Sequence, residues 1–187
     1  MGIGSNTSYA ATGTPISTPE EFLAIANNPA GNYYLANDIT LPANTTLGDV
    51  TFTGTFDGNN HKIKGYTFTG TDAYFETALF PSCKNATFKN LSLTNVNINI
   101  NAGVHGARVA ALADYAANCT FENIKTTGTI TLNGAGDMVC NYNVGGIISS
   151  GVNCTLKKCT NSINIKVNCL TPYNSASVCG IGDGIYT

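Results

Sequence analysis

A repeat with a step of about 33 to 35 residues runs from Ala78 onward and constrains the fold more than any other feature. Two motifs recur at this step: a small or apolar triplet, and an Asn-x-Thr segment followed by an apolar residue. Residues that recur at one step are expected to stack as ladders in neighbouring coils. The predicted ladders are Leu79, Leu112, Ile147 and Ile181; Phe88, Phe121 and Leu156; and Asn85, Asn118 and Asn153.

A third repeated segment, 96–100 with its counterparts 129–132 and 163–167, alternates apolar and polar residues. This alternation is typical of a strand with one buried and one exposed face. One coil of such strands cannot bury its inner face alone, whereas stacked coils can. A β-sandwich would instead show hairpin turns every 8 to 12 residues or so. The predicted fold is therefore all-β, a single-stranded parallel β-helix, or solenoid.

The region before the repeats is predicted to close the first coil. Residues 1–15 form a small, polar N-terminal segment, and residues 16–187 form a single β-helix domain. Thr18, Pro19 and Glu21 supply an N-cap, a first-turn proline and a capping-box partner, so a short capping α-helix is predicted over 19–26. This helix is expected to cover strand edges that would otherwise promote aggregation.

The segments after this helix resemble a known family. The first is Tyr-x-Leu-x-x-Asp-Ile at 33–39, the second is Phe-x-Gly-x-Phe-Asp-Gly-Asn-x-His-x-Ile at 52–63, and repeats with Gly-Gly-Ile follow. The pattern resembles the GLUG-motif right-handed parallel β-helix proteins of bacterial surfaces. These include adhesin-like proteins and the N-terminal regions of immunoglobulin-A-cleaving metallopeptidases. The resemblance implies a right-handed β-helix and an extracellular or cell-surface scaffold or adhesin, which binds a glycan or a protein on a surface. It supplies no catalytic residues.

The composition argues against two other classes of partner. Only 11% of the residues are charged, the formal net charge is -2, and the 9 basic residues are spread along the chain. This leaves no basic stripe for a phosphate backbone, so no nucleic-acid partner is predicted. No apolar run approaches the roughly 20 residues that cross a bilayer, so no membrane span is predicted.

We predict that the chain is not an enzyme. A glycosidase needs two carboxylates that project into one cleft, whereas the aspartates here occupy different repeat positions. The cluster from Asp57 to His61 is interpreted as a turn, and no metal or cofactor is predicted. A polysaccharide-active β-helix enzyme stays open as an alternative, because enzymes that cut pectin-like polymers share this fold. The aspartates compared are Asp38, Asp57, Asp72, Asp114, Asp137 and Asp183.

The seven cysteines divide by repeat position. Cys119 and Cys154 share one position, and Cys159 stands where earlier repeats have Leu91 and Ile124, so these three are predicted to be buried core thiols. The other four fall in or near turns and are available for disulfides whose pairing the sequence does not assign. They are Cys83, Cys140, Cys169 and Cys179.

A further alternative is self-assembly into a filament. The segment Asn6, Thr7, Ser8 and Tyr9 resembles a repeat strand and is predicted to complete the last coil of another molecule, near Ile181 and Ile185, by strand addition. Such a head-to-tail contact does not close on itself, so it would build a filament along the helix axis. Exposed aromatic residues such as Tyr74 or Tyr173 would instead favour glycan binding, because sugar rings stack on aromatic rings.

Overall fold

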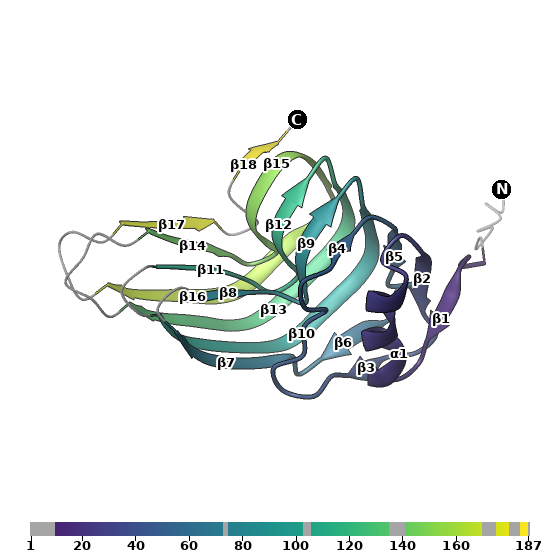
Figure 1. The fold of residues 1–187 in the computed structure, drawn as a ribbon, viewed down its shortest axis with the longest axis horizontal. Coiled ribbons are helices and arrows are strands. Elements are labelled where there is room, and N and C mark those ends of the chain that lie inside the picture. Colours follow the sequence, from purple (N-terminus) through teal and green to yellow (C-terminus); the bar gives the residue numbers. More distant parts are fainter. Residues whose placement is uncertain are drawn as a thin grey trace, which may run out of the picture.

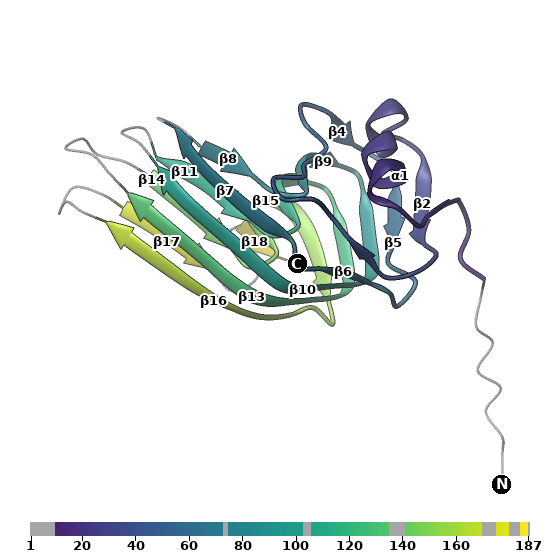
Figure 2. The same cartoon turned by 90° about the horizontal axis from the view of Figure 1, so that it is seen from below.

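The computed structural model of the chain is a parallel β-solenoid of about three turns with a short helix near its N-terminal end (Figures 1 and 2). The structure describes residues 10–72, 75–102, 106–134, 141–169, 175–179 and 184–186. The predicted all-β, parallel β-helix fold is confirmed.

The elements follow one another coil by coil around the solenoid (Figure 1). In chain order they are β1 (Thr14–Ile16), α1 (Pro19–Leu23), the 3₁₀-helix η1 (Ala24–Asn27), β2 (Asn32–Leu35), β3 (Ile39–Thr40), β4 (Thr51–Phe52), β5 (Thr55–Asp57), β6 (Lys62–Lys64), β7 (Thr67–Asp72), β8 (Phe75–Thr77), β9 (Phe80–Lys84), β10 (Thr87–Ala102), β11 (Ala107–Ala110), β12 (Ala113–Ala117), β13 (Thr120–Gly134), β14 (Asn141–Gly145), β15 (Ile148–Lys157), β16 (Thr160–Cys169), β17 (Ser175–Cys179) and β18 (Gly184–Tyr186).

The strands stack into parallel sheets, which we name A, B and C. Sheet A is built around β5, β10, β13 and β16, sheet B around β4, β9, β12 and β15, and sheet C around β8, β11, β14 and β17. The long strand β10 pairs with β5, β6 and β7 in turn, because it continues around a corner where the earlier coil is broken. One coil therefore contributes to all three sheets.

The strand register places the predicted apolar ladders inside the solenoid. Ala113 pairs with Phe80 in the coil before and with Ile148 in the coil after, which stacks the preceding residues Leu79, Leu112 and Ile147. Phe88 pairs with Phe121, which pairs with Leu156, and the two phenylalanine rings stack with centroids 5.0 Å apart. All of these side chains are buried except Leu156, which is partly buried. The apolar columns thus form the core.

The asparagines at one corner are explained by backbone conformation. Asn85, Asn118 and Asn153 have φ angles of 52, 54 and 52°, in the left-handed region that asparagine tolerates better than most residues. Their side chains are exposed. Hydrogen bonds between stacked amides occur at other positions. These pairs are Asn90–Asn123, Asn101–Asn133 and Asn133–Asn168.

Helix α1 starts at the expected capping box and closes one end of the core. The Thr18 hydroxyl accepts the Glu21 N–H at 3.2 Å, and the Glu21 carboxylate accepts the Thr18 N–H at 3.3 Å. Phe22 then points inward, with its ring centroid 6.0 Å from that of Phe56 and 5.7 Å from that of Phe80. The helix therefore covers the N-terminal coil, as Figure 2 shows.

Two glycines allow the bend from sheet C into sheet B. A Cβ atom on Gly145 would lie 1.6 Å from the carbonyl oxygen of Ile148, and one on Gly146 would lie 2.2 Å from the amide of Asn161. That amide oxygen accepts a hydrogen bond from the Thr126 hydroxyl at 2.7 Å, so it has little freedom to move. The close approach of a backbone oxygen at Gly145 and of a side-chain amide at Gly146, rather than an unusual φ, thus accounts for the Gly-Gly pair.

The structure places four free cysteines. Cys119 and Cys154 are buried as predicted, and Cys159 is half-buried. Cys83 lies near a turn, two residues before the corner at Asn85, and its side chain is buried within β9. Its column runs through Phe52, Cys83, Ala116 and Gly151, in which no residue type repeats. Cys140 lies outside the described residues.

Candidate functional site

The turn after Asp57 is held by hydrogen bonds within the protein. Asp57 Oδ1 accepts the backbone N–H of Asn59 at 2.8 Å and Nδ2 of Asn90 at 3.2 Å, and its Oδ2 lies 3.2 Å from Lys89 Nζ. Asn59 and Asn60 adopt φ angles of 49 and 63°. Each carboxylate oxygen has a protein partner, which supports the interpretation of this cluster as a turn.

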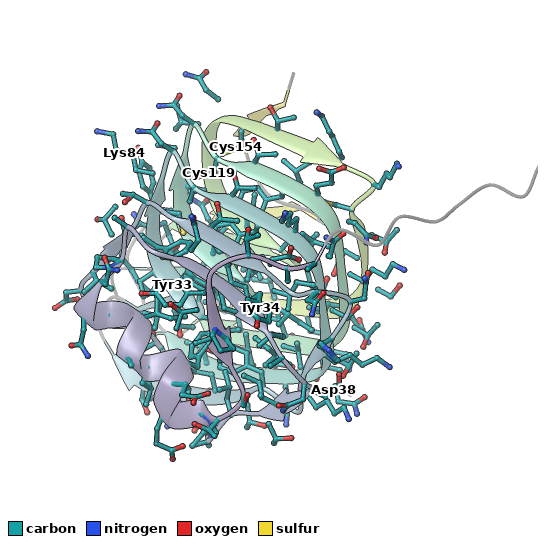
Figure 3. All side chains as sticks on the ribbon, turned by 90° about the vertical axis from the view of Figure 1, so that its right-hand side faces the viewer. Tyr33, Tyr34, Asp38, Lys84, Cys119 and Cys154 are labelled. Carbon is teal, nitrogen blue, oxygen red and sulfur yellow. The ribbon has the colours of Figure 1, made fainter. Side chains whose placement is uncertain are left out.

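Asp38 forms a second charged cluster at the surface, at the edge of the molecule in Figure 3. Its Oδ2 lies 2.8 Å from Lys64 Nζ, while Oδ1 accepts the Lys62 N–H at 2.9 Å and lies 3.3 Å from His61 Nδ1. The hydrogen bond from Lys64, followed by that from the Lys62 N–H, lowers the pKa of Asp38 to about 2. A carboxyl group that stays ionised above this pH is suited to ion pairing between coils and poorly suited to general acid catalysis.

A pocket of about 350 Å³ lies between strand β1 and the helical cap. Ile16, Ala24 and Tyr33 contribute apolar surface to its lining. The Glu21 carboxylate in this lining already accepts backbone N–H groups at the start of α1, and the Tyr33 hydroxyl donates to the Asn28 carbonyl at 2.7 Å. The polar groups of the pocket thus serve the cap.

The most concentrated polar chemistry occurs where sheets B and C meet, at the bend between β11 and β12 (Figure 1). The Arg108 guanidinium binds Asp114 with Nε 3.2 Å from Oδ1 and Nη2 3.3 Å from Oδ2. Its Nη2 also contacts Glu76 Oε1. The Ser149 hydroxyl contacts the Asp114 carboxylate and lies 2.7 Å from the Asp114 carbonyl oxygen. We call these four residues the Arg108 cluster.

The cluster runs from a buried charge to an accessible one. The side chain of Asp114 is 2% exposed, that of Arg108 is 30% exposed, and that of Glu76 is 40% exposed. Burial raises the pKa of Asp114, while the hydrogen bonds from Ser149 and Arg108 act against that rise. Because one guanidinium serves two carboxylates, the fully ionised cluster keeps one excess negative charge.

The outer face of sheet B beside this cluster is partly apolar. Tyr115 directly follows Asp114 and is 40% exposed, and Val152 in the next coil is 45% exposed. Ala113 and Ala116 are both in the core although they are three residues apart, with the buried Asp114 and the exposed Tyr115 between them. Strand β12 therefore departs from strict alternation at this point.

Hydroxyl groups flank the exposed ring. Tyr115 pairs with Ser82 in the coil before and with Ser150 in the coil after. The hydroxyls of Ser82 and Thr51 lie 3.0 Å apart. Aromatic, hydroxyl, carboxylate and guanidinium groups are thus collected on one side of the solenoid. We call this surface the Tyr115 face; it comprises the Arg108 cluster with Thr51, Ser82, Tyr115, Ser150 and Val152.

The comparison of repeat positions covered the aspartates alone and therefore missed one pair of carboxylates that come together. Asp114 meets Glu76 through Arg108, although the two acids occupy different positions of the repeat. Glu76 and Arg108 are paired in sheet C one residue out of step with the ladder of Leu79 and Leu112, so the repeat alignment alone does not give their contact. The contact with Asp114 depends on the bend, which the repeat does not reveal.

Several residues singled out from the sequence lie outside the described residues. Ile185 belongs to β18, which pairs with β15 of the same chain. In the described ranges no group of three or more His, Cys, Asp or Glu side chains is arranged to hold a metal ion. No helix in the same ranges is long and apolar enough to cross a membrane. The residues singled out above that lie outside these ranges, besides Cys140, are Asn6, Thr7, Ser8, Tyr9, Tyr74, Asp137, Tyr173, Ile181 and Asp183.

Fold and surface together define a parallel β-solenoid module with a helical cap and a polar, partly aromatic outer face. Residues 20–128, from α1 into β13, match the family described as M26 IgA1-specific metallo-endopeptidase N-terminal region. The chain belongs to this family. A comparison with curated proteins returns no match.

Proposed function

We propose that the chain is a non-catalytic extracellular or cell-surface module, a rigid scaffold that contacts a carbohydrate through the Tyr115 face. The observation that carries this proposal is the exposed Tyr115 ring beside the Arg108 cluster. Sheets B and C hold these groups on hydrogen-bonded strands, so little ordering is needed when a ligand binds.

The chemistry of the face suits a sugar. A pyranose ring offers an apolar face, which stacks on tyrosine, and hydroxyls, which bind carboxylate, guanidinium and serine groups. Glu76 and Arg108 are accessible enough to take part, whereas Asp114 is buried and orients Arg108. The excess negative charge of the cluster favours a neutral sugar over an acidic one.

Family membership supports the location. The family name refers to the N-terminal region of peptidases specific for IgA1, a secreted antibody, so an extracellular position is the consistent one. A region named separately from the peptidase chemistry also fits a role in structure or adhesion. The GLUG-motif label, which rests on repeats such as Gly145-Gly146-Ile147, stays a prediction.

A polysaccharide-active enzyme is the second candidate, because Glu76 and Asp114 share one guanidinium. The raised pKa of Asp114 is a property expected of a general acid. Against this, the Asp114 side chain is 2% exposed, and its hydrogen bonds to Arg108 and Ser149 occupy both of its oxygens. We therefore favour binding over catalysis.

A glycan array followed by calorimetry on the best ligand tests the proposal. The Tyr115→Ala variant is expected to weaken binding roughly tenfold, which corresponds to about 1.4 kcal/mol of stacking. Tyr34→Ala is the matched control, since it removes a half-exposed tyrosine from sheet A. Absence of any glycan ligand, or equal losses in both variants, would refute carbohydrate binding at this face.

The enzyme candidate needs its own assay. The chain is incubated with plant and microbial polysaccharides, and reducing or unsaturated ends are measured. We expect none to appear. Ends released by the unmodified chain and lost in Glu76→Gln would replace the binding proposal with a catalytic one.

A further inference from the structure

Cys119 and Cys154 occupy the same position in neighbouring coils. The adjacent residues Thr120 and Thr155 are paired, and the Thr155 N–H donates to the Cys119 carbonyl at 2.9 Å. Neighbouring strands lie about 4.8 Å apart. This spacing falls within the range of about 4.4 to 6.8 Å that a disulfide requires between Cα atoms.

The two sulfur atoms lie in the same part of the core. Cys154 Sγ is 3.4 Å from the carbonyl oxygen of Ala116, in the coil that carries Cys119, and 3.6 Å from that of Val152 in its own coil. It therefore lies between the two coils, and its interaction with the Cys119 thiol shifts the pKa of both groups. Both thiols are free and buried, and Figure 3 shows them close together in neighbouring coils.

We infer that Cys119 and Cys154 form a disulfide in an oxidising medium, which locks the coil of β15 and β16 onto the coil of β13. The oxidant is a low-molecular-weight disulfide such as oxidised glutathione. The Cys154 thiolate attacks one of its sulfurs and displaces one glutathione thiolate. The Cys119 thiolate then attacks Cys154 Sγ and displaces the second. The protein loses two thiol protons and two electrons, and one oxidised glutathione becomes two reduced molecules.

Cys154 is the thiol suited to make the first attack. The hydrogen bond from Cys119 lowers the pKa of Cys154, and the same contact raises the pKa of Cys119. Burial raises the pKa of the Cys83 and Cys159 thiols, which keeps them protonated. Because Cys154 is buried, the oxidant reaches it when its coil opens. Strand β15 pairs with β13 on one side, and on its other side it pairs, among the described strands, only with the short β18. The coil that contains β15 is therefore the one expected to open locally.

The test uses the full chain in buffers with graded ratios of oxidised to reduced glutathione. Free thiols are blocked with iodoacetamide in denaturant, and the peptides are mapped by mass spectrometry. We expect a linked peptide pair containing Cys119 and Cys154, together with a higher urea midpoint that dithiothreitol reverses. Cys119→Ala and Cys154→Ala are expected to lose both effects. Cys159→Ala, the matched control, is expected to keep them.

Two outcomes would overturn the inference. One is complete alkylation of Cys119 and Cys154 at every glutathione ratio. The other is a linked peptide that joins either of them to Cys83 or to any other cysteine. Because mapping of the unmodified chain decides between these results, a variant that fails to fold leaves the test intact.

Discussion

Replacement of Leu112 by alanine is expected to lower the free energy of unfolding by about 3 to 4 kcal/mol. Leu112 is fully buried, with Leu79 and Ile147 stacked in the coils on either side. The variant lacks three buried carbons, and at about 0.8 kcal/mol for each the lost transfer free energy is about 2 kcal/mol. A residual cavity of about 50 Å³, at roughly 24 cal/mol per Å³, adds about 1 kcal/mol.

Urea unfolding followed by circular dichroism measures this loss. Asn60→Ala is the control, because Asn60 is exposed and has a φ of 63°. This variant only replaces asparagine, which tolerates the left-handed region, by alanine, which does so less well, and the expected loss of unfolding free energy is roughly 1 kcal/mol. Equal losses at the two sites would refute the stacking of Leu112. The double variant Leu112→Ala with Ile147→Ala should be non-additive, since the two side chains share one cavity.

Three further changes test other parts of the structure. Lys158 has a φ of 53° at the position that Asn123 occupies one coil earlier, so Lys158→Asn is expected to raise the urea midpoint, by roughly 0.5 to 1 kcal/mol of stability. The pKa of Asp38 is lowered from 3.8 to about 2. The ionised carboxylate therefore stabilises the fold above pH 4 or so, and this stabilisation is lost as the pH falls toward 2. The Asp38→Asn variant should show a flatter dependence of unfolding free energy on pH between these values. Thr18→Ala removes the N-cap acceptor of the Glu21 N–H and should cost about 1 kcal/mol by thermal unfolding.

The core was predictable because its chemistry repeats. Leu112 and Ile147 recur at the coil step, and the capping box at Thr18 is a short-range signal. The buried column that contains Cys83 was not predicted, because no residue type repeats along it. The neighbours of Cys83 shrink along the axis from Phe52 to Ala116, which fills a tapering space without repeating a residue type.

The candidate site was harder to predict, since it depends on departures from regular structure. Strict alternation would place Ala113 and Ala116 on opposite faces of β12, yet both are in the core. Arg108 also reaches Asp114 across the bend between two sheets. Neither the local irregularity nor the bend angle is contained in the period of the repeat. The sequence pattern therefore located the strands but not the polar cluster between them.

The order of the coils has a separate physical origin from the stability of the core. The apolar ladders are nearly interchangeable, because any coil presents leucine, isoleucine or phenylalanine to its neighbours. One charged column is not interchangeable: Asp57 pairs with Lys89, Lys89 with Glu122, and Glu122 with Lys157, so the sign alternates at every step. A mispairing that skipped β13 and put β10 against β15 would bring Lys89 beside Lys157, and like charges at that spacing repel.

Exposed pairs of this kind contribute little net stability, about 0 to 1 kcal/mol each. Their effect is on specificity, since they penalise the wrong neighbour in a chain whose repeated apolar ladders are alike from coil to coil.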